Sequence, residues 1–313
     1  MRCKWRQIMI GEWEEGKDAF QYEIKNDRVE ILQWKGSGET AHIPENILGK
    51  PVHSIGRKSF LSNKRLREVF LPGSVKALGD WAFAYCSSLT AVHLSKDCAV
   101  FGKGAFLNCS HLERIFTFSQ DDIDKGGDVE EQRAALLAAA PCALDAPYLL
   151  TPLEAGSREW LEKWDARLMQ VMELSDREGY SKTLLCGEED YGSKENNLDF
   201  FLSQKRKSKV RLAMLRLLHA EGLLPQMRIF LETYLRSHTK GCGQEETWRV
   251  VLEDYGTRKE YYDLLFEVEA LTRDNFDAAL RDMGTELTEM KAYLLKRREE
   301  CFGDNEFFDS FAL

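Results

Sequence analysis

The sequence predicts an α+β protein in which a short solenoid of repeated strands is followed by an all-α helical bundle or helical array. Two observations predict this. Glycine and hydrophobic residues recur with a period of 23 residues between positions 52 and 118, and such a period is typical of solenoids in which each copy supplies one short strand. From residue 157 onward, hydrophobic residues recur instead at the spacing of amphipathic helices.

Three copies of the repeat lie end to end, at residues 52–74, 75–97 and 98–118. The aligned copies share glycine, phenylalanine, leucine and β-branched columns, namely Gly56, Gly79 and Gly102; Phe60, Phe83 and Phe106; Leu66, Leu89 and Leu112; and Val69, Val92 and Ile115. The first two copies contain L-x-x-V-x-L, as LREVFL and LTAVHL, and the third has the variant LERIFT. This pattern is the signature of a leucine-rich repeat. Equivalent residues should lie roughly 5 Å apart, so the phenylalanines should stack as an internal aromatic ladder.

The middle copy contains AFAYCSSLTAVHL, in which Cys86 and His93 could be a nucleophile and its base. A catalytic cysteine needs a lowered pKa and a base within reach. Cys86 shares its column with Asn63 and Cys109. This favours a structural role, a small side chain inside a coil, over a catalytic one. Stacking could bring Cys86 and Cys109 within disulfide distance, but we expect free thiols.

The segments LGDWAFAYCSSLTAVHL and FGKGAFLNCSHLERIFT, with a weaker copy at IGRKSFLSNKRLREVFL, fit the pattern I-G-x-x-A-F-x-x-C-x-x-L-x-x-V-x-L. This pattern resembles the bacterial BspA-type leucine-rich repeats, over residues 20 to 118. The upstream segment resembles the usual start of such arrays. It offers an opening strand pair, FQYEI and VEILQW, followed by IPENILGKPV. The resemblance implies a binding surface, because such proteins mostly act through their surfaces.

Composition is that of an ordinary soluble protein. Of the 313 residues, 43% are hydrophobic, and no run approaches the roughly 18 apolar residues of a membrane span. The start, MRCKWRQIMIGEWEEGKD, lacks a long apolar segment and a small-residue cleavage site. The eight cysteines lack the regular spacing of a secreted disulfide framework. We therefore expect a bacterial, cytoplasmic protein, which departs from BspA-type proteins displayed on cell surfaces.

Charge is shared unevenly along the chain. Residues 1–118 carry 17 Lys and Arg against 13 Asp and Glu, a formal charge of +4, whereas residues 119–313 carry 26 against 39, a formal charge of −13. Phosphates would be repelled by the acidic part. We therefore expect neither nucleic acid nor a membrane among the partners.

The period ends at residue 118, and the polar stretch SQDDIDKGGDVEEQ follows. We predict a repeat domain over residues 1–118, a linker over 119–156 that contains a short helix in VEEQRAALLAAA, and a helical domain over 157–313.

The helical domain should contain six or seven amphipathic helices. Trp160, Trp164, Leu168 and Val171 lie on one face of the first; Phe201 and Leu202 belong to another; Leu212, Leu215 and Leu218 belong to the next. Pro225 suits a first turn, and Thr272 is a plausible N-cap. An echo between LLHAEGLLPQ and LFEVEALTRD hints at repeated helix pairs.

Two segments suggest metal ligands. Asp122, Asp124, Gly127 and Asp128 echo a calcium loop, but Arg133 stands where a bidentate glutamate is needed. His238, Cys242 and Cys186 could meet a metal in space, although a structural zinc normally needs four ligands. We favour an acidic linker and ordinary side chains, and we predict no metal and no cofactor.

The basic run QKRKSKVR, residues 204 to 211, could touch a phosphate or an acidic partner. It opens a helix whose other face is apolar, so we expect a solvated face, neutralised by acidic residues 188–190. No phosphate-binding loop, nucleophile elbow, dinucleotide fingerprint or zinc-protease helix is present in the sequence.

Alternation in each repeat strand sends one set of side chains outward. The first outward column is Phe70, His93 and Phe116, extended by Phe118; the second is Glu68, Ala91 and Arg114. Exposed aromatic stripes usually mark contact surfaces. The stripe could pack against the helical domain, bind a partner protein, or bind a saccharide or peptide.

We therefore predict a non-catalytic protein–protein interaction module or scaffold that binds a partner through Phe70, His93, Phe116, Glu68, Arg114 and Phe118. The alternative is an effector or enzyme whose helical domain carries the active site and whose repeats recruit the substrate. The exposed edge of the solenoid could also let the chain associate with itself.

Overall fold

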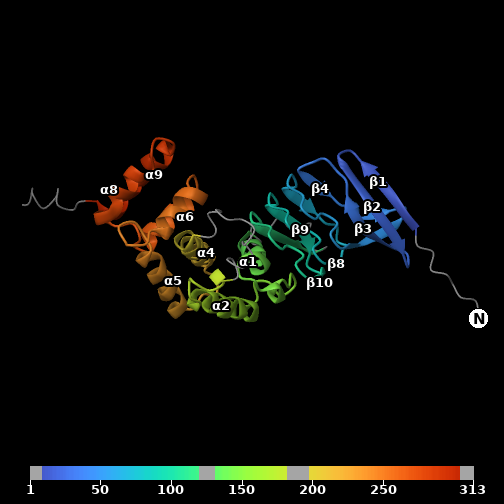
Figure 1. Ribbon diagram of the computed structural model, residues 1–313, viewed down its shortest axis with the longest axis horizontal. Helices are drawn as coiled ribbons and strands as arrows, with labels where there is room; N and C mark the ends of the chain where they lie inside the picture. Colours follow the sequence, from blue (N-terminus) through green and yellow to red (C-terminus); the bar gives the residue numbers. More distant parts are fainter. Residues whose placement is uncertain (1–8, 120–130, 182–196, 304–313) are drawn as a thin grey trace, which may run out of the picture. The chain divides into compact units, whose positions relative to one another are not determined.

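The structure is a computed structural model that describes residues 9–119, 131–181 and 197–303 (Figure 1). The chain forms two compact units, Met1–Leu168 and Met169–Leu313. Each has its own fold and is described by itself. The domain boundaries predicted at residues 118 and 156 stay predictions.

The first unit is built around two β-sheets that alternate along the chain. One sheet has the order β1-β2-β3-β6-β8-β10, with β5 beside β6, and the other has the order β11-β9-β7-β4. The strands are β1 (Met9–Glu15), β2 (Asp18–Lys25), β3 (Arg28–Trp34), β4 (Thr40–His42), β5 (Asn46–Ile47), β6 (Lys50–Ile55), β7 (Glu68–Phe70), β8 (Ala77–Leu78), β9 (Ala91–Ser95), β10 (Val100–Phe101) and β11 (Arg114–Phe118). The successive coils form a β-solenoid over residues 29–118, as predicted.

The solenoid begins with an antiparallel hairpin, β2 and β3, at the place where an opening strand pair is predicted. Phe20, Tyr22 and Ile24 of β2 are buried and alternate with less buried neighbours, which is the period of a strand with one face on a core. The edge strand β1 pairs with β2 and was not predicted.

The internal aromatic ladder is confirmed. Ring centroids lie 4.7 Å apart between Phe60 and Phe83 and 5.5 Å apart between Phe83 and Phe106, and all three rings are buried. Trp34 extends the ladder by one ring, 5.8 Å from Phe60. Stacking one ring per coil fills the solenoid interior with aromatic area, a large part of its hydrophobic stabilisation.

The glycine column marks the closest approach of neighbouring coils. A Cβ atom at Gly79 would lie 2.6 Å from the backbone nitrogen of Arg57, and one at Gly102 would lie 2.3 Å from the backbone nitrogen of Asp80. Because both obstacles are backbone atoms, only glycine fits without a shift of the coil.

Helix α1 (Glu131–Cys142) packs against the last strand, β11, and caps the solenoid within the first unit (Figure 1). It covers residues 131–140 of the short helix predicted over 129–140, and residues 129 and 130 lie outside the described residues. Helix α2 (Arg158–Glu173) carries the predicted tryptophans: the indole N–H of Trp160 donates to the Leu149 carbonyl at 2.9 Å, and that of Trp164 donates to the Leu136 carbonyl at 3.1 Å. An array this short needs such a cap, because its last coil would otherwise expose its hydrophobic interior.

The second unit is helical, as predicted. Its helices are α4 (Leu198–Leu218), α5 (Pro225–Ser237), α6 (Glu246–Asp254), α7 (Lys259–Glu267), α8 (Arg273–Asp282) and α9 (Thr288–Phe302). Pro225 begins α5 and Thr272 is the N-cap of α8, as predicted. The prediction of two helices over residues 201–218 is wrong, because α4 runs unbroken through both segments.

The solvated-face interpretation of the basic run is also wrong. Lys207 and Lys209 are buried in α4. Lys207 pairs with Glu253, and Lys209 pairs with Asp176 at 2.8 Å. Helix α4 lies against α5, α6 and α7, so acidic partners distant in sequence surround the run. Residues 188–190 lie outside the described residues.

The echo between LLHAEGLLPQ and LFEVEALTRD corresponds to two helix–loop–helix junctions. The N-caps of α5 and α8, Leu224 and Thr272, are 48 residues apart. Each junction contains one residue with left-handed backbone, Gly222 with φ of 66° and Glu269 with φ of 57°. The two segments therefore turn the chain in similar ways.

None of the helices in the described part of the chain is long and apolar enough to cross a membrane.

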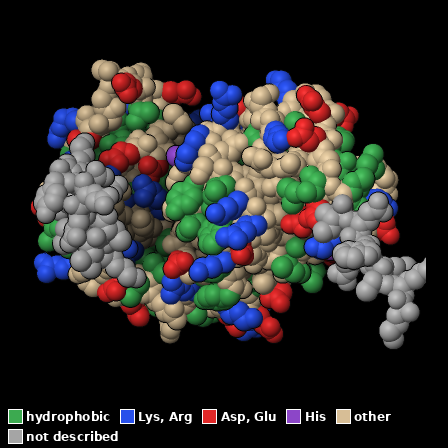
Figure 2. All heavy atoms as spheres, turned by 45° about the vertical axis from the view of Figure 1, so that its right-hand side comes forward, with side chains coloured by type: hydrophobic (Ala, Val, Ile, Leu, Met, Phe, Trp, Pro, Cys, Tyr) green, Lys and Arg blue, Asp and Glu red, His purple; other side chains and the backbone are tan. Residues whose placement is uncertain are grey.

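Figure 2 shows one face of the molecule, where Lys and Arg side chains lie among Asp and Glu side chains, and hydrophobic side chains form small groups.

Candidate binding surface

The outward column is built by four parallel strands in register, β4, β7, β9 and β11. Phe70 pairs with His93 across β7 and β9, and His93 pairs with Phe116 across β9 and β11. The ring centroids lie 4.2 Å apart between Phe70 and His93 and 4.7 Å apart between His93 and Phe116, with nearly parallel planes. The structure thus brings the three predicted rings together as one stack.

His42 adds a fourth ring that sequence reasoning missed. Its ring stacks on Phe70 with centroids 4.7 Å apart, and β4 pairs with β7 so that the two residues are direct partners. We call His42, Phe70, His93 and Phe116 the ring column. A local signal could have found it, because A-H-I-P at residues 41–44 matches V-F-L-P at 69–72.

The ring column is neither buried nor fully open. His42 is exposed, and Phe70, His93 and Phe116 are half-buried. Because the rings cover one another's faces, both faces of Phe70 and of His93 are occupied. An approaching molecule therefore meets ring edges and imidazole nitrogens, and ring edges carry the positive end of the quadrupole.

The remaining predicted residues surround the ring column. Oε1 of Glu68 accepts a hydrogen bond from Nε2 of His93 at 2.8 Å. Arg114 forms an ion pair with Glu131, the first residue of α1, at 3.2 Å. Phe118 is half-buried and lies on β11 two residues after Phe116. Glu68 therefore orients the His93 imidazole, and Arg114 links strand β11 to helix α1 through its ion pair with Glu131.

Cys86 is a structural residue. It is buried, and its thiol donates to the Phe60 carbonyl, Sγ to oxygen 3.0 Å; Cys109 repeats the contact with the Phe83 carbonyl at 3.0 Å. Burial raises the pKa of Cys86 to about 11, so the thiol stays protonated near neutral pH and lacks nucleophilic character. Every cysteine in the described residues is a free thiol.

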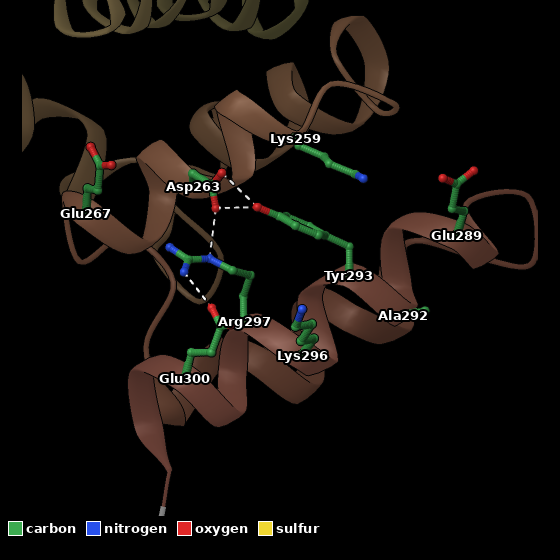
Figure 3. A pocket seen from close by; sticks show the side chains of 9 residues that line it. All are labelled: Lys259, Asp263, Glu267, Glu289, Ala292, Tyr293, Lys296, Arg297 and Glu300. Atoms are coloured by element: carbon green, nitrogen blue, oxygen red, sulfur yellow. Dashed lines mark hydrogen bonds and ion pairs between the residues drawn. The ribbon is translucent and has the colours of Figure 1, made fainter.

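The helical unit contains an open cavity of about 690 Å³ between α7 and α9 (Figure 3). The Tyr293 hydroxyl donates to the Asp263 carboxylate at 2.7 Å, and Arg297 pairs with the same carboxylate at 2.9 Å. Burial, together with the Asp263 carboxylate, raises the pKa of Tyr293 to about 12. Tyr293 therefore remains protonated at neutral pH, and Asp263 is engaged by two donors.

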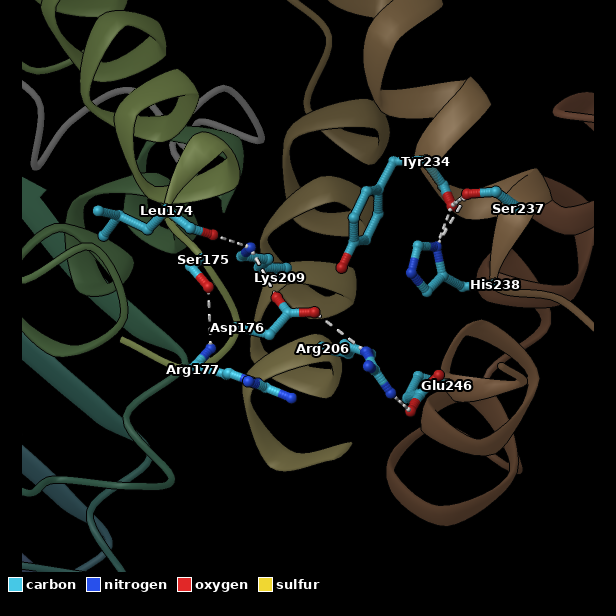
Figure 4. A network of polar contacts seen from close by, with 10 residues as sticks. All are labelled: Leu174, Ser175, Asp176, Arg177, Arg206, Lys209, Tyr234, Ser237, His238 and Glu246. Atoms are coloured by element: carbon cyan, nitrogen blue, oxygen red, sulfur yellow. Dashed lines mark hydrogen bonds and ion pairs between the residues drawn. The ribbon is translucent and has the colours of Figure 1, made fainter. Parts of the chain in front are cut away.

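A second polar network joins the segment that follows α2 to α4 and α6 (Figure 4). Asp176 lies between Lys209 and Arg206, with the Arg206 pair at 3.0 Å, and Arg206 also approaches Glu246. Burial opposes ionisation of Asp176, but hydrogen bonds and charge from Lys209 and Arg206 lower its pKa. The network shows how α4 tolerates Arg206 and Lys209 away from solvent, because each has a carboxylate partner.

The candidate metal ligands His238 and Cys242 form hydrogen bonds with backbone carbonyls. Nδ1 of His238 contacts the Tyr234 carbonyl at 2.9 Å, and the Cys242 thiol donates to the Arg236 carbonyl at 3.5 Å. Cys186 and the segment from Asp122 to Asp128 lie outside the described residues. Across residues 9–119, 131–181 and 197–303, no three His, Cys, Asp or Glu side chains are placed to hold a metal ion.

One known protein family matches the repeat region of this chain. Residues 38–125 match the BspA type leucine rich repeat region, in six copies. The first unit contains a BspA-type leucine-rich repeat region. The match covers less than a third of the chain and ends before α1.

Solved structures of bacterial leucine-rich repeat proteins are similar to this chain. A T. pallidum leucine-rich repeat protein is 32% identical over 31% of this chain and 46% of its own, with a TM-score of 0.30. One from Bacteroides capillosus is 29% identical over 33% of this chain and 78% of its own, with a TM-score of 0.29. The chain thus spans about half the length of the T. pallidum protein. No curated protein matches it.

Proposed function

We propose that this protein is a non-catalytic interaction module that binds a partner protein through the ring column and its neighbours Glu68, Arg114 and Phe118. The main support for this proposal is a continuous stack of rings that are partly exposed to solvent. It crosses four in-register strands and consists of His42, Phe70, His93 and Phe116. Leucine-rich repeat proteins commonly mediate protein–protein interaction, which supports the same conclusion.

The geometry favours a protein over a saccharide as the occupant. A sugar ring stacks on the face of an aromatic ring, but the faces of Phe70 and His93 are already covered. Ring edges and imidazole nitrogens suit carbonyl oxygens, carboxylates and the faces of aromatic side chains. The half-exposed rings likewise support a partner rather than complete burial inside this protein.

A catalytic helical region is the alternative, and the cavity between α7 and α9 is the observation that bears on it. The polar side chains that line the cavity pair with one another, since the Asp263 carboxylate accepts from Tyr293 and forms an ion pair with Arg297. A hydroxyl with a raised pKa is a poor base or nucleophile near neutral pH. The ring column is therefore the better-supported functional surface.

The test compares the wild-type chain with a Phe70→Ser, Phe116→Ser double variant. Partners are captured from the native cell extract, identified, purified and titrated by calorimetry. Loss of two central aromatic contacts should weaken binding by roughly 2 kcal/mol, about thirtyfold. The control is Leu224→Ser with Ile229→Ser, two exposed apolar residues on and before α5.

Circular dichroism must first show that the double variant folds. If it does not, His42→Ser replaces it, because His42 is exposed at the end of the ring column and its loss opens no cavity. A folded variant that keeps wild-type affinity for every partner would disprove a role for the ring column.

A further inference from the structure

A different surface of the solenoid carries a concentration of unpaired positive charge. It lies on the turns between the two sheets, at residues 56–66, 79–89 and 102–112. The exposed cations there are Arg57, Lys58, Lys64, Arg65 and Lys103, which we call the basic turn surface. Asp80 is the one acidic residue in these turns. Within the described residues none of the five cations forms an ion pair.

Coil stacking brings three of these cations, Arg57, Lys58 and Lys64, to two aromatic residues of the middle coil. The guanidinium carbon of Arg57 lies 4.9 Å from the centre of the Trp81 ring, and Nζ of Lys58 lies 5.5 Å from it. Lys103 belongs to the next coil, and its carbonyl accepts from the Trp81 backbone N–H at 3.0 Å. Nζ of Lys64 donates to the Tyr85 carbonyl at 3.0 Å.

Both aromatic residues occupy backbone positions that disfavour them. Trp81 has φ of 53° and Tyr85 has φ of 60°, in the left-handed region. The left-handed conformation recurs in every coil: the equivalent positions hold Lys58 and Ser62 in the first coil, with φ of 60° and 59°, and Gly104 and Asn108 in the third, with φ of 61° and 56°. Only the third coil uses the residue types that adopt this conformation most readily. A bulky side chain there strains the backbone.

Tyr85 does not serve the core, and Trp81 is half-buried. The Tyr85 side chain is 44% exposed, and the interior of the same coil is filled by Phe83. Strained backbone that holds side chains toward solvent is typical of ligand sites. Two exposed leucines, Leu61 and Leu107, lie in the turns of the neighbouring coils, so these turns present both apolar and cationic groups.

We propose that the basic turn surface is a second docking site, for an acidic peptide segment that also carries hydrophobic side chains. Carboxylates would pair with Arg57, Lys58 and Lys103, whereas apolar side chains would pack on Trp81, Tyr85 and the leucines. Nucleic acid fits less well, since the leucines offer nothing to phosphates and the chain carries a net charge of −9. The site does not depend on the ring column.

The test uses the full-length protein and fluorescent 12-residue peptides in anisotropy titrations. An alternating Glu–Leu peptide should bind at least about tenfold more tightly than the matched Gln–Leu peptide in 50 mM NaCl. The difference should shrink several-fold in 200 mM NaCl, because exposed charges are screened. Equal binding of the two peptides overturns the proposal.

The decisive variant is Trp81→Gly with Tyr85→Asn, which installs the residue types of the third coil. It should bind the Glu–Leu peptide at least about tenfold more weakly, while relief of strain offsets lost packing in its thermal unfolding. Should it fail to fold, Arg57→Gln with Lys58→Gln replaces it, since both side chains are exposed. Unchanged binding by a folded variant also overturns the proposal.

Two further measurements identify other occupants. Tighter binding of a duplex DNA than of the Glu–Leu peptide would overturn the proposal in favour of nucleic acid. Concentration-dependent dimerisation of the wild type, lost in the variant, would overturn it in favour of a second copy of the chain. The Phe70→Ser, Phe116→Ser variant should keep peptide binding, so failure of one surface is distinguishable from failure of the other.

Discussion

At the scale of single residues, the glycine column sets the distance between coils. Gly79→Ala places a methyl group 2.6 Å from the Arg57 backbone nitrogen and 2.7 Å from the Gly56 carbonyl carbon. Because neither backbone atom can rotate away, the coils must separate, which we expect to cost roughly 1–3 kcal/mol. Urea unfolding followed by circular dichroism measures the loss.

Gly243→Ala is the matched control. No atom lies within 4 Å of a Cβ at Gly243, and its φ is not left-handed. The same added methyl group should therefore leave the unfolding midpoint unchanged. Equal shifts in the two variants would show that the close approach at Gly79 is not what limits the coil.

Residue positions inside the repeats could be predicted from the sequence, because the period of 23 fixes which side chains meet. Phe60, Phe83 and Phe106 stack as predicted. The stacking of His42 on Phe70 and of Trp34 on Phe60 was not predicted. These pairs are 28 and 26 residues apart rather than one period of 23 residues. An insertion between coils hides a residue from periodicity while leaving its place in the stack intact.

At the scale of elements, α1 is the cap on which the end of the solenoid depends. Leu137 of α1 is fully buried, whereas Leu153 in the same unit is 75% exposed. Leu137→Ala should destabilise the first unit by about 2–5 kcal/mol through lost burial and a cavity. Leu153→Ala should have almost no effect. Chemical unfolding, monitored through tryptophan fluorescence and circular dichroism, compares the two.

The helices show where sequence patterns stop being informative. Pro225 and Thr272 were placed correctly because helix starts depend on local chemistry. Lys207 and Lys209 were placed wrongly in solvent because their burial depends on Glu253 and Asp176, which are 46 and 33 residues away. A charged run predicts solvation only when no distant partner compensates its burial, and a single sequence does not reveal such partners.

At the scale of the whole molecule, the sheet edges decide whether the chain associates with itself. An open edge offers unpaired backbone groups to another chain. Helix α1 packs on β11, while β4 and β10 have three and two residues. The longest edge strand, β1, carries Glu12, Glu14 and Glu15. Charge and short length are devices that discourage edge pairing.

We therefore expect a monomer of 36.0 kDa in sedimentation velocity at neutral pH. Glu12→Val with Glu14→Val removes two charges from β1 and adds β-branched side chains, so it should promote concentration-dependent association. Glu289→Val with Glu299→Val, both exposed on α9, changes charge and hydrophobicity equally away from any edge and should stay monomeric. Association of the wild type, or of both variants alike, would contradict the edge argument, because only the β1 variant alters a strand that another chain could extend.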